Sequence, residues 1–289
     1  MDEVEKESIH LCLTDPPYGL DKMGSDWTFD KVHDLKNMNA VTSLPSGMKF
    51  DPNQGKTLYD WMLPVSQKIY EKLVPGAFYL VFCAPRLYHR VACAVEDAGF
   101  YIKDMYLWMY TQNQPKAMGL DYWISKSKLD ADEKEDLKEK AKGWKTPQVR
   151  SNHEPIVFAQ KPLEGNFVQN FKKHGVGLVN TNLKIGCDND RFPSNVLADN
   201  GFCNDIERHF LVPKPTKKEK GEENTHKTVK PLNLCEYLIQ SLTQKDQVVL
   251  DPFAGSGTTL VAAKNSDRKY CGIELNKEYI DIIKRRLEV

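Results

Sequence analysis

The feature that most constrains the fold is a strand, a helix and a second strand in close succession near the carboxyl terminus. Residues 247–250 form a short apolar strand, a helix is predicted to about Lys264, and a second strand covers 270–273. Strands this close in sequence and joined by a helix pair in parallel, and the crossover between them is right-handed in nearly all proteins. The pattern therefore predicts an α/β protein built on a doubly wound, mostly parallel sheet.

The same alternation runs through the first half of the chain. Strands are predicted at 9–14, 77–82, 102–109 and 156–159, and helices at 58–73, ended by Pro75-Gly76, and at 86–98, 232–242 and 278–287. The continuous apolar run at 77–82 indicates a strand that is buried on both faces. Residues 126–150 are dense in charge and predict a solvated helix and loop.

A glycine-containing loop follows the strand at 247–250. It reads Asp-Pro-Phe-Ala-Gly-Ser-Gly-Thr-Thr over 251–259, and Glu274 ends the next strand. Glycines there let a ligand approach the backbone, and a carboxylate at the second strand can bind two ribose hydroxyls. Leu260 replaces the third glycine of a dinucleotide loop, and no Gly-Lys-Ser/Thr phosphate loop is present. These features favour a nucleoside cofactor; the alternative is a plain strand-to-helix turn with a surface glutamate.

A second motif, Asp15-Pro16-Pro17-Tyr18, follows the strand at 9–14. The two prolines have fixed φ and no N–H, so the loop offers a carboxylate and carbonyl oxygens as acceptors. Such acceptors suit a conjugated amino group, whose nitrogen lone pair they help to localise, and Tyr18 can stack on a planar base. The alternative is a Pro-Pro turn that merely ends a strand.

Together the two motifs resemble those of the DNA amino-methyltransferases, with the acceptor motif first, as in the β arrangement of that family. Residues 226–231 (His-Lys-Thr-Val-Lys-Pro) resemble the segment leading into the cofactor loop, and 152–159 resemble the strand region before the target-recognition part. Residues 191–197 are similar to a segment common in phage- and plasmid-borne members.

The resemblance implies a Rossmann-like methyltransferase fold with circularly permuted motif order. Its mostly parallel twisted sheet would contain one reversed strand, from the pair 102–109 and 156–159. It also implies S-adenosyl-L-methionine as cofactor, no metal, and transfer of a methyl group to a base flipped out of double-stranded DNA. The implied acceptor residues are Asp15, Pro16, Pro17 and Tyr18. The implied cofactor residues are Asp251, Phe253, Ala254, Gly255, Gly257, Thr258, Thr259, Glu274, His226, Thr228 and Lys230.

Adenine N6 is favoured as the target because members that methylate cytosine N4 more often have Ser at the position of Asp15. Three alternatives stay open: an N4-cytosine enzyme, an RNA or protein-amide methyltransferase, and a non-catalytic DNA-binding protein. RNA and amide enzymes usually begin the motif with Asn. The non-catalytic alternative is motivated by the 14 residues before Asp15, which lack the Gly-Asp pair usual in the family.

The predicted domains are a catalytic domain, 1–161 with 226–289, and a target-recognition insert, 162–225. The insert holds nine Lys/Arg and nine Asp/Glu, so recognition would depend on the placement of charges, as with the adjacent pair Lys172 and Lys173. The whole chain is equally balanced, with 40 basic and 40 acidic residues, which excludes binding to DNA by bulk charge.

Seven scattered cysteines without a Cys-x-x-Cys pair argue against a disulfide framework or a zinc site. With no signal peptide and no long apolar run, we expect a protein of the bacterial cytoplasm without a membrane partner. A homodimer and a cognate restriction enzyme are further partners that the resemblance allows.

Overall fold

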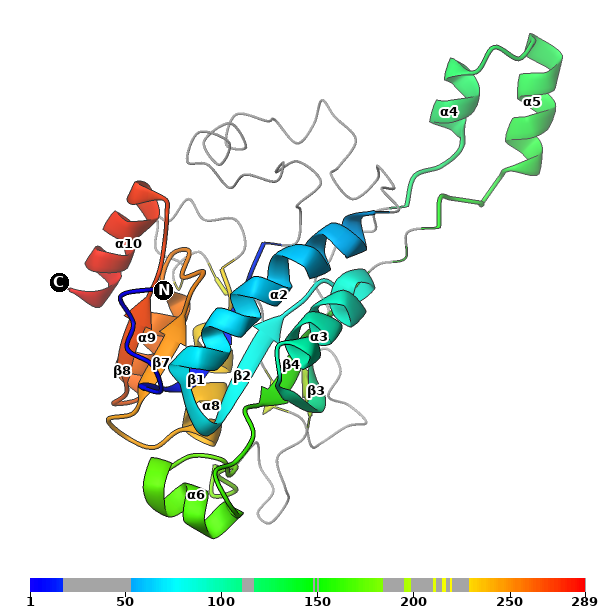
Figure 1. The fold of residues 1–289 in the computed structure, drawn as a ribbon. Helices are drawn as coiled ribbons and strands as arrows, with labels where there is room; N and C mark the ends of the chain where they lie inside the picture. Colours follow the sequence, from blue (N-terminus) through cyan, green and yellow to red (C-terminus); the bar gives the residue numbers. More distant parts are fainter. Residues whose placement is uncertain are drawn as a thin grey trace.

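One twisted sheet organises the computed structural model, which describes residues 1–17, 53–110, 117–147, 149, 151–183, 195–198, 210–211, 215–216, 219 and 229–288 (Figure 1). Its eight described strands lie in the order β6-β5-β3-β4-β2-β1-β7-β8. They are β1 (Ile9–Thr14), β2 (Leu73–Phe82), β3 (Tyr101–Met109), β4 (His153–Gln160), β5 (Val196–Ala198), β6 (Phe210–Leu211), β7 (Val248–Asp251) and β8 (Lys269–Gly272).

Strand β4 is the one reversed strand among those described. It pairs antiparallel with β2 and with β3, whereas the β1–β2, β1–β7, β7–β8, β3–β5 and β5–β6 pairs are parallel. The prediction of a mostly parallel sheet with a reversed strand in the β3–β4 pair is therefore confirmed. The parallel strands all end at one edge of the sheet, here named the carboxyl edge, and begin at the amino edge.

Helices cover both faces of the sheet, as the strand–helix alternation predicts (Figure 1). They are α2 (Gln54–Lys72), α3 (Tyr88–Asp97) after the short 3-10 helix η3 (Pro85–Leu87), α4 (Asp121–Lys126), α5 (Ala131–Lys140), α6 (Phe167–His174), α8 (Leu232–Leu242), α9 (Thr258–Asn265) and α10 (Lys277–Leu287). Cys12 of β1 packs in one core cluster with α2 and α3, while its neighbours Leu11 and Leu13 pack in another with α8 and α9. This alternation follows from the period of two in a strand.

Helix α2 ends at Lys72, one residue before its predicted end at 73. Leu73 is already extended and begins β2, and Pro75-Gly76 lies inside that strand. The register with β1 slips there, from Ile9 opposite Leu73 to Leu11 opposite Phe78, as at a β-bulge. Gly76 supplies a φ of 80° at the slip. The dipeptide therefore marks an irregular strand start, because a bulge accepts a proline and a left-handed glycine as readily as a turn does.

The described part of segment 162–225 packs with the catalytic body. Strands β5 and β6 extend the sheet beyond β3. Helix α6 lies at the amino edge, where the Gly175 carbonyl that follows it accepts from the side chains of Gln244 and Gln247, just before β7. Lys172 and Lys173 are on this helix, and Lys173 is paired with Glu164 at 2.6 Å. The role of the segment in target recognition is not tested by this packing and stays a prediction.

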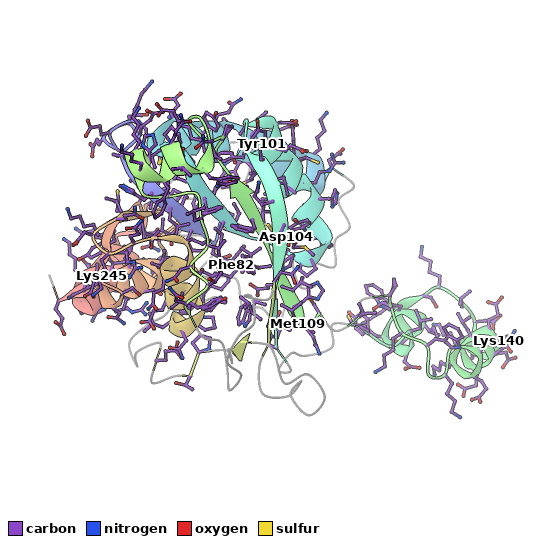
Figure 2. The ribbon with its side chains drawn as sticks, turned by 90° about the horizontal axis from the view of Figure 1, so that it is seen from below. Phe82, Tyr101, Asp104, Met109, Lys140 and Lys245 are labelled. Atoms are coloured by element: carbon purple, nitrogen blue, oxygen red, sulfur yellow. The ribbon has the colours of Figure 1, made fainter. Side chains whose placement is uncertain are left out.

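Helices α4 and α5 form a hairpin that projects from the carboxyl edge, between β3 and β4. Figure 2 shows Lys140 of α5 far from the body, beyond the Met109 end of β3. Helix α5 begins with a capping box at Asp130 and Glu133 and has no buried residue. The predicted solvated helix is thus confirmed. No helix in the described part of the chain is long and apolar enough to cross a membrane.

Candidate active site

The two predicted motifs meet at the carboxyl edge because β1 and β7 are neighbours. Leu11 pairs with Val249 and Cys12 with Leu250, so the strands run in step to their ends. The Thr14 hydroxyl then donates to the buried Asp251 carboxylate at 2.6 Å. Asp15 is the next residue of the chain. Acceptor motif and glycine loop are therefore joined by a direct side-chain hydrogen bond.

The glycine loop is tight and has little room for side chains. Gly257 has a φ of 83°, and a Cβ placed there would lie 2.9 Å from Cγ1 of Ile283. Gly255 has a φ of 53°. From α10, Arg286 donates to the Ser256 carbonyl at 2.7 Å and to the Thr258 hydroxyl at 3.2 Å. These bonds hold the loop in one shape at the start of α9, where the first backbone N–H groups of a helix have no acceptor within the helix.

Glu274 lies just beyond β8 and contacts the glycine loop. One carboxylate oxygen accepts from the Gly255 backbone N–H at 2.8 Å, and the other accepts from the Asn276 N–H at 2.8 Å. A carboxylate has about four lone-pair sites, so both oxygens keep capacity for hydroxyl donors. The position is that of a ribose-binding carboxylate in a doubly wound fold.

Asp251 is a buried acid inside the loop. Burial raises its pKa to about 6, against the opposing effect of hydrogen bonds from Thr14, Thr259 and the Phe253 N–H. The Phe253 ring lies 5.3 Å from that of Trp61 on α2. Thr258 and Thr259 are buried at the start of α9, and Ala254 is buried beside them. Seven predicted cofactor residues, 251, 253–255 and 257–259, thus lie along the end of β7, the turn after it and the start of α9.

Asp15 belongs to a cluster of charged side chains. The Lys230 ammonium donates to Asp15 Oδ2 and lies 3.3 Å from Glu154 Oε2 on β4. Only 8% of the Lys230 side chain is exposed, and its Nζ also lies over the Phe82 ring. Pro16 is buried, and Pro17 is half-buried.

The structure brings together most but not all of the predicted site residues. Tyr18, His226 and Thr228 lie outside the described residues. Lys230, predicted as a cofactor residue, lies in the acceptor half of the site; its contact with the cofactor stays a prediction. Glu154, Trp61 and Arg286 were not predicted as site residues. The only signal for Glu154 was its place in the segment 152–159.

The chemistry of the glycine loop fits S-adenosyl-L-methionine. A carboxylate beside backbone N–H groups suits a ribose, and the positive φ of Gly257 leaves the backbone open to a ligand. Among the described residues, no group of three or more His, Cys, Asp or Glu side chains could hold a metal ion.

This sheet, with its reversed strand and its two motifs at neighbouring strand ends, defines the class: a Rossmann-like methyltransferase that uses S-adenosyl-L-methionine. The chain belongs to the DNA methylase family, whose model matches residues 9–285. It is thus a DNA amino-methyltransferase, as the resemblance implied. An origin in a phage or plasmid is not tested and stays a prediction.

Individual relatives agree with this family. The chain is 30% identical to the Type II methyltransferase M.HindIII of Haemophilus influenzae, over 99% of this chain and 91% of that protein. Two solved structures share the fold. The M1.HpyAVI–SAM complex matches with a TM-score of 0.53 and 22% identity, over 98% of this chain and 90% of the other. The PvuII cytosine-N4-specific DNA methyltransferase matches with a TM-score of 0.57 and 17% identity, over 99% and 81%.

Proposed function

We propose that this protein is a site-specific Type II methyltransferase that methylates the exocyclic N6 of adenine in double-stranded DNA. The observation that carries the proposal is the placement of Asp15 at the carboxyl edge, joined to the cofactor loop through Thr14 and Asp251. The likeness to M.HindIII along nearly the whole chain supports the Type II assignment.

The acceptor half would bind the target base by its amino group. That group is paired and stacked inside a duplex, so the base must first be flipped out of the helix. Asp15 and the Pro16 carbonyl would then accept the amino hydrogens, and Tyr18 would stack on the base. When bound, S-adenosyl-L-methionine supplies the methyl group as an electrophile. The residues of this chain mainly hold the two reactants in line. This positioning removes a large part of the activation barrier, because the entropy of bringing two molecules together has already been lost on binding.

The preference for adenine rests on the aspartate that begins the acceptor motif, since N4-cytosine enzymes more often have Ser there. Family membership favours DNA over RNA or a protein amide as substrate. Recognition of a particular sequence is assigned to segment 162–225. Its strands β5 and β6 run parallel to β3, so the chain leaves both at the carboxyl edge. A homodimer and a restriction enzyme that recognises the same site remain predictions.

The test is methylation of duplex DNA, with RNA of the same sequence as comparison. DNA is incubated with the protein and methyl-labelled S-adenosyl-L-methionine, digested to nucleosides and analysed by mass spectrometry. We expect N6-methyl-2′-deoxyadenosine in the duplex arm and none with Asp15→Ala. N4-methyl-2′-deoxycytidine would refute the choice of base. Label in RNA alone, or in no nucleic acid despite cofactor binding, would refute the proposed function.

A further inference from the structure

The charged cluster at Asp15 joins three segments that are distant in sequence. Asp15 follows β1, Glu154 is the second residue of β4, and Lys230 precedes α8. Glu154 reaches the carboxyl edge because β4 is reversed: Phe82, the last residue of β2, pairs with Ile156, so β4 begins beyond that end. A parallel strand in the same place would bring its last residues there instead. The reversal of β4 therefore places the Glu154 carboxylate next to the Lys230 ammonium.

The cluster combines two carboxylates with one ammonium, so it carries one net negative charge when all three are ionised. Burial lowers the pKa of Lys230, but the Asp15 and Glu154 carboxylates outweigh burial and raise that pKa above the usual range for lysine. The ammonium is therefore charged throughout the range from pH 6.5 to 9. The side chains of Asp15 and Glu154 are 20% and 22% exposed, so both carboxylates are largely shielded from water.

We infer that Lys230 and Glu154 are positioning residues for Asp15: Lys230 holds the Asp15 carboxylate in place, and Glu154 adds the charge that keeps the cluster negative. The inference rests on the proposed function. In methyl transfer the amino nitrogen forms the new N–C bond with its lone pair, and the C–S bond breaks with its electron pair going to sulfur. The nitrogen is cationic until it releases one proton, by way of Asp15, to water.

A negative cluster stabilises this transient cation, whereas an isolated Asp15–Lys230 pair would be neutral and stabilise it less. For one unit charge several ångströms from the nitrogen, at an effective dielectric constant of about 20, the effect on rate is roughly 10- to 100-fold. Glu154→Gln keeps the shape of the side chain and an acceptor oxygen. It should therefore slow single-turnover methylation of duplex DNA by this factor and leave cofactor affinity unchanged.

Lys230→Met should behave differently from Glu154→Gln. Without the ammonium that both of them contact, two shielded carboxylates are left as like charges close to each other, and their repulsion raises the apparent pKa of the pair. A proton taken up by the pair cancels the negative charge that stabilises the cation, so the rate should be low at pH 6.5 and should rise toward pH 9. The double variant, with Glu154→Gln added, has a single carboxylate and should lose this rise. Wild-type enzyme should show no such rise.

Other titratable groups around the cluster do not produce this profile. Burial raises the pKa of the Cys83 and Cys235 thiols above their usual range, and it raises the pKa of Tyr110 to about 12. Asp251 has a pKa of about 6 and so still loses part of its proton above pH 6.5, but it is present in wild type and in every variant, and a comparison among them removes its contribution. The two thiols and Tyr110 keep their charge state between pH 6.5 and 9.

Lys161 offers a matched control at the amino edge. It is also a buried lysine with a carboxylate partner, Glu7 at 3.2 Å, and it donates to the Leu73 carbonyl at 2.7 Å. Lys161→Met should lower stability but leave the pH profile of methylation unchanged. Thermal unfolding of each variant shows that the compared proteins are folded. Glu154→Gln preserves the side-chain shape and keeps the test open if Lys230→Met does not fold.

The outcomes distinguish a failure of the proposed function from a failure of the role assigned to Lys230 and Glu154. If wild-type protein methylates no DNA, the proposed function fails, and this inference fails with it. If wild-type protein methylates DNA while Glu154→Gln matches its rate and Lys230→Met shows no pH-dependent rise, the inference alone is overturned. A Lys230→Met variant that loses cofactor affinity with an unchanged pH profile also overturns it, because Lys230 would then be a cofactor ligand.

Discussion

Replacement of Glu274 by alanine tests the cofactor half of the site. Each Glu274 carboxylate oxygen accepts one backbone N–H at 2.8 Å, from Gly255 and from Asn276. The remaining lone pairs are assigned to the ribose hydroxyls. Glu274→Ala removes the acceptors of the hydroxyls and also releases the glycine loop. A hydrogen bond to a charged group contributes about 1.5–3 kcal/mol net, and Glu274 is only half-buried, so we expect a loss of roughly 1–3 kcal/mol in cofactor binding.

That loss corresponds to a dissociation constant for S-adenosyl-L-methionine that is roughly 5- to 150-fold higher, measured by titration calorimetry. Urea unfolding without cofactor measures the separate effect of the two lost loop bonds on stability. Glu71→Ala is the control, because it removes an exposed carboxylate at the amino edge, where Glu71 pairs with Lys6 at 3.4 Å. If Glu274→Ala bound cofactor within twofold of wild type, Glu274 would be a structural acceptor for the loop and nothing more.

Three further changes test other parts of the site. Asp15→Ala should lower the methylation rate by orders of magnitude with little change in cofactor affinity, and a near wild-type rate would remove Asp15 from the acceptor site. Asp251→Asn, which can keep the hydrogen bonds from Thr14 and the Phe253 N–H, should change how stability depends on pH. Because the folded-state pKa of Asp251 is raised to about 6, wild type should lose stability relative to this variant as pH rises from about 4 to 6, and chemical denaturation at several pH values measures the difference. Lys172→Ala with Lys173→Ala should weaken DNA binding and lower its salt slope by up to about two units, with cofactor affinity unchanged, if α6 contacts phosphates. An unchanged slope would mean that both lysines are solvated and that α6, at the amino edge, does not contact DNA.

Much of the site could be predicted because its parts are contiguous in sequence. The acceptor motif and the glycine loop each follow an apolar run that reads as a strand. Parallel strands end at the same edge, so both motifs had to lie at one edge of the sheet. The order of the strands was not predictable in the same way. That β1 lies between β2 and β7, and so brings Thr14 to Asp251, depends on long-range packing.

The structure changed the interpretation of the adjacent pair Lys172 and Lys173 from a loop to a helix. Lys172 and Lys173 stand in a stretch rich in Asn and Gly, which by composition resembles a solvent-exposed recognition loop. In the structure they lie on α6, whose N-terminal Asn166 forms a capping box with Gln169. The buried Asn170 side chain donates to the Val176 carbonyl and ties the helix to the following turn. Such local caps are visible in sequence, but the edge of the sheet that the helix occupies is not.

By itself, then, the sequence determined the type of the elements that flank the two motifs and the chemistry of each motif, because apolar periodicity and the φ preferences of Gly and Pro act over a few residues. Only the tertiary structure decided which charges meet. Lys230 stands in a segment that resembles a cofactor motif, yet its ammonium pairs with Asp15 and Glu154. The physical reason is that a lysine buried at 8% exposure needs carboxylate partners. Which carboxylates are within reach depends on the neighbouring strand β1 and on the reversed strand β4.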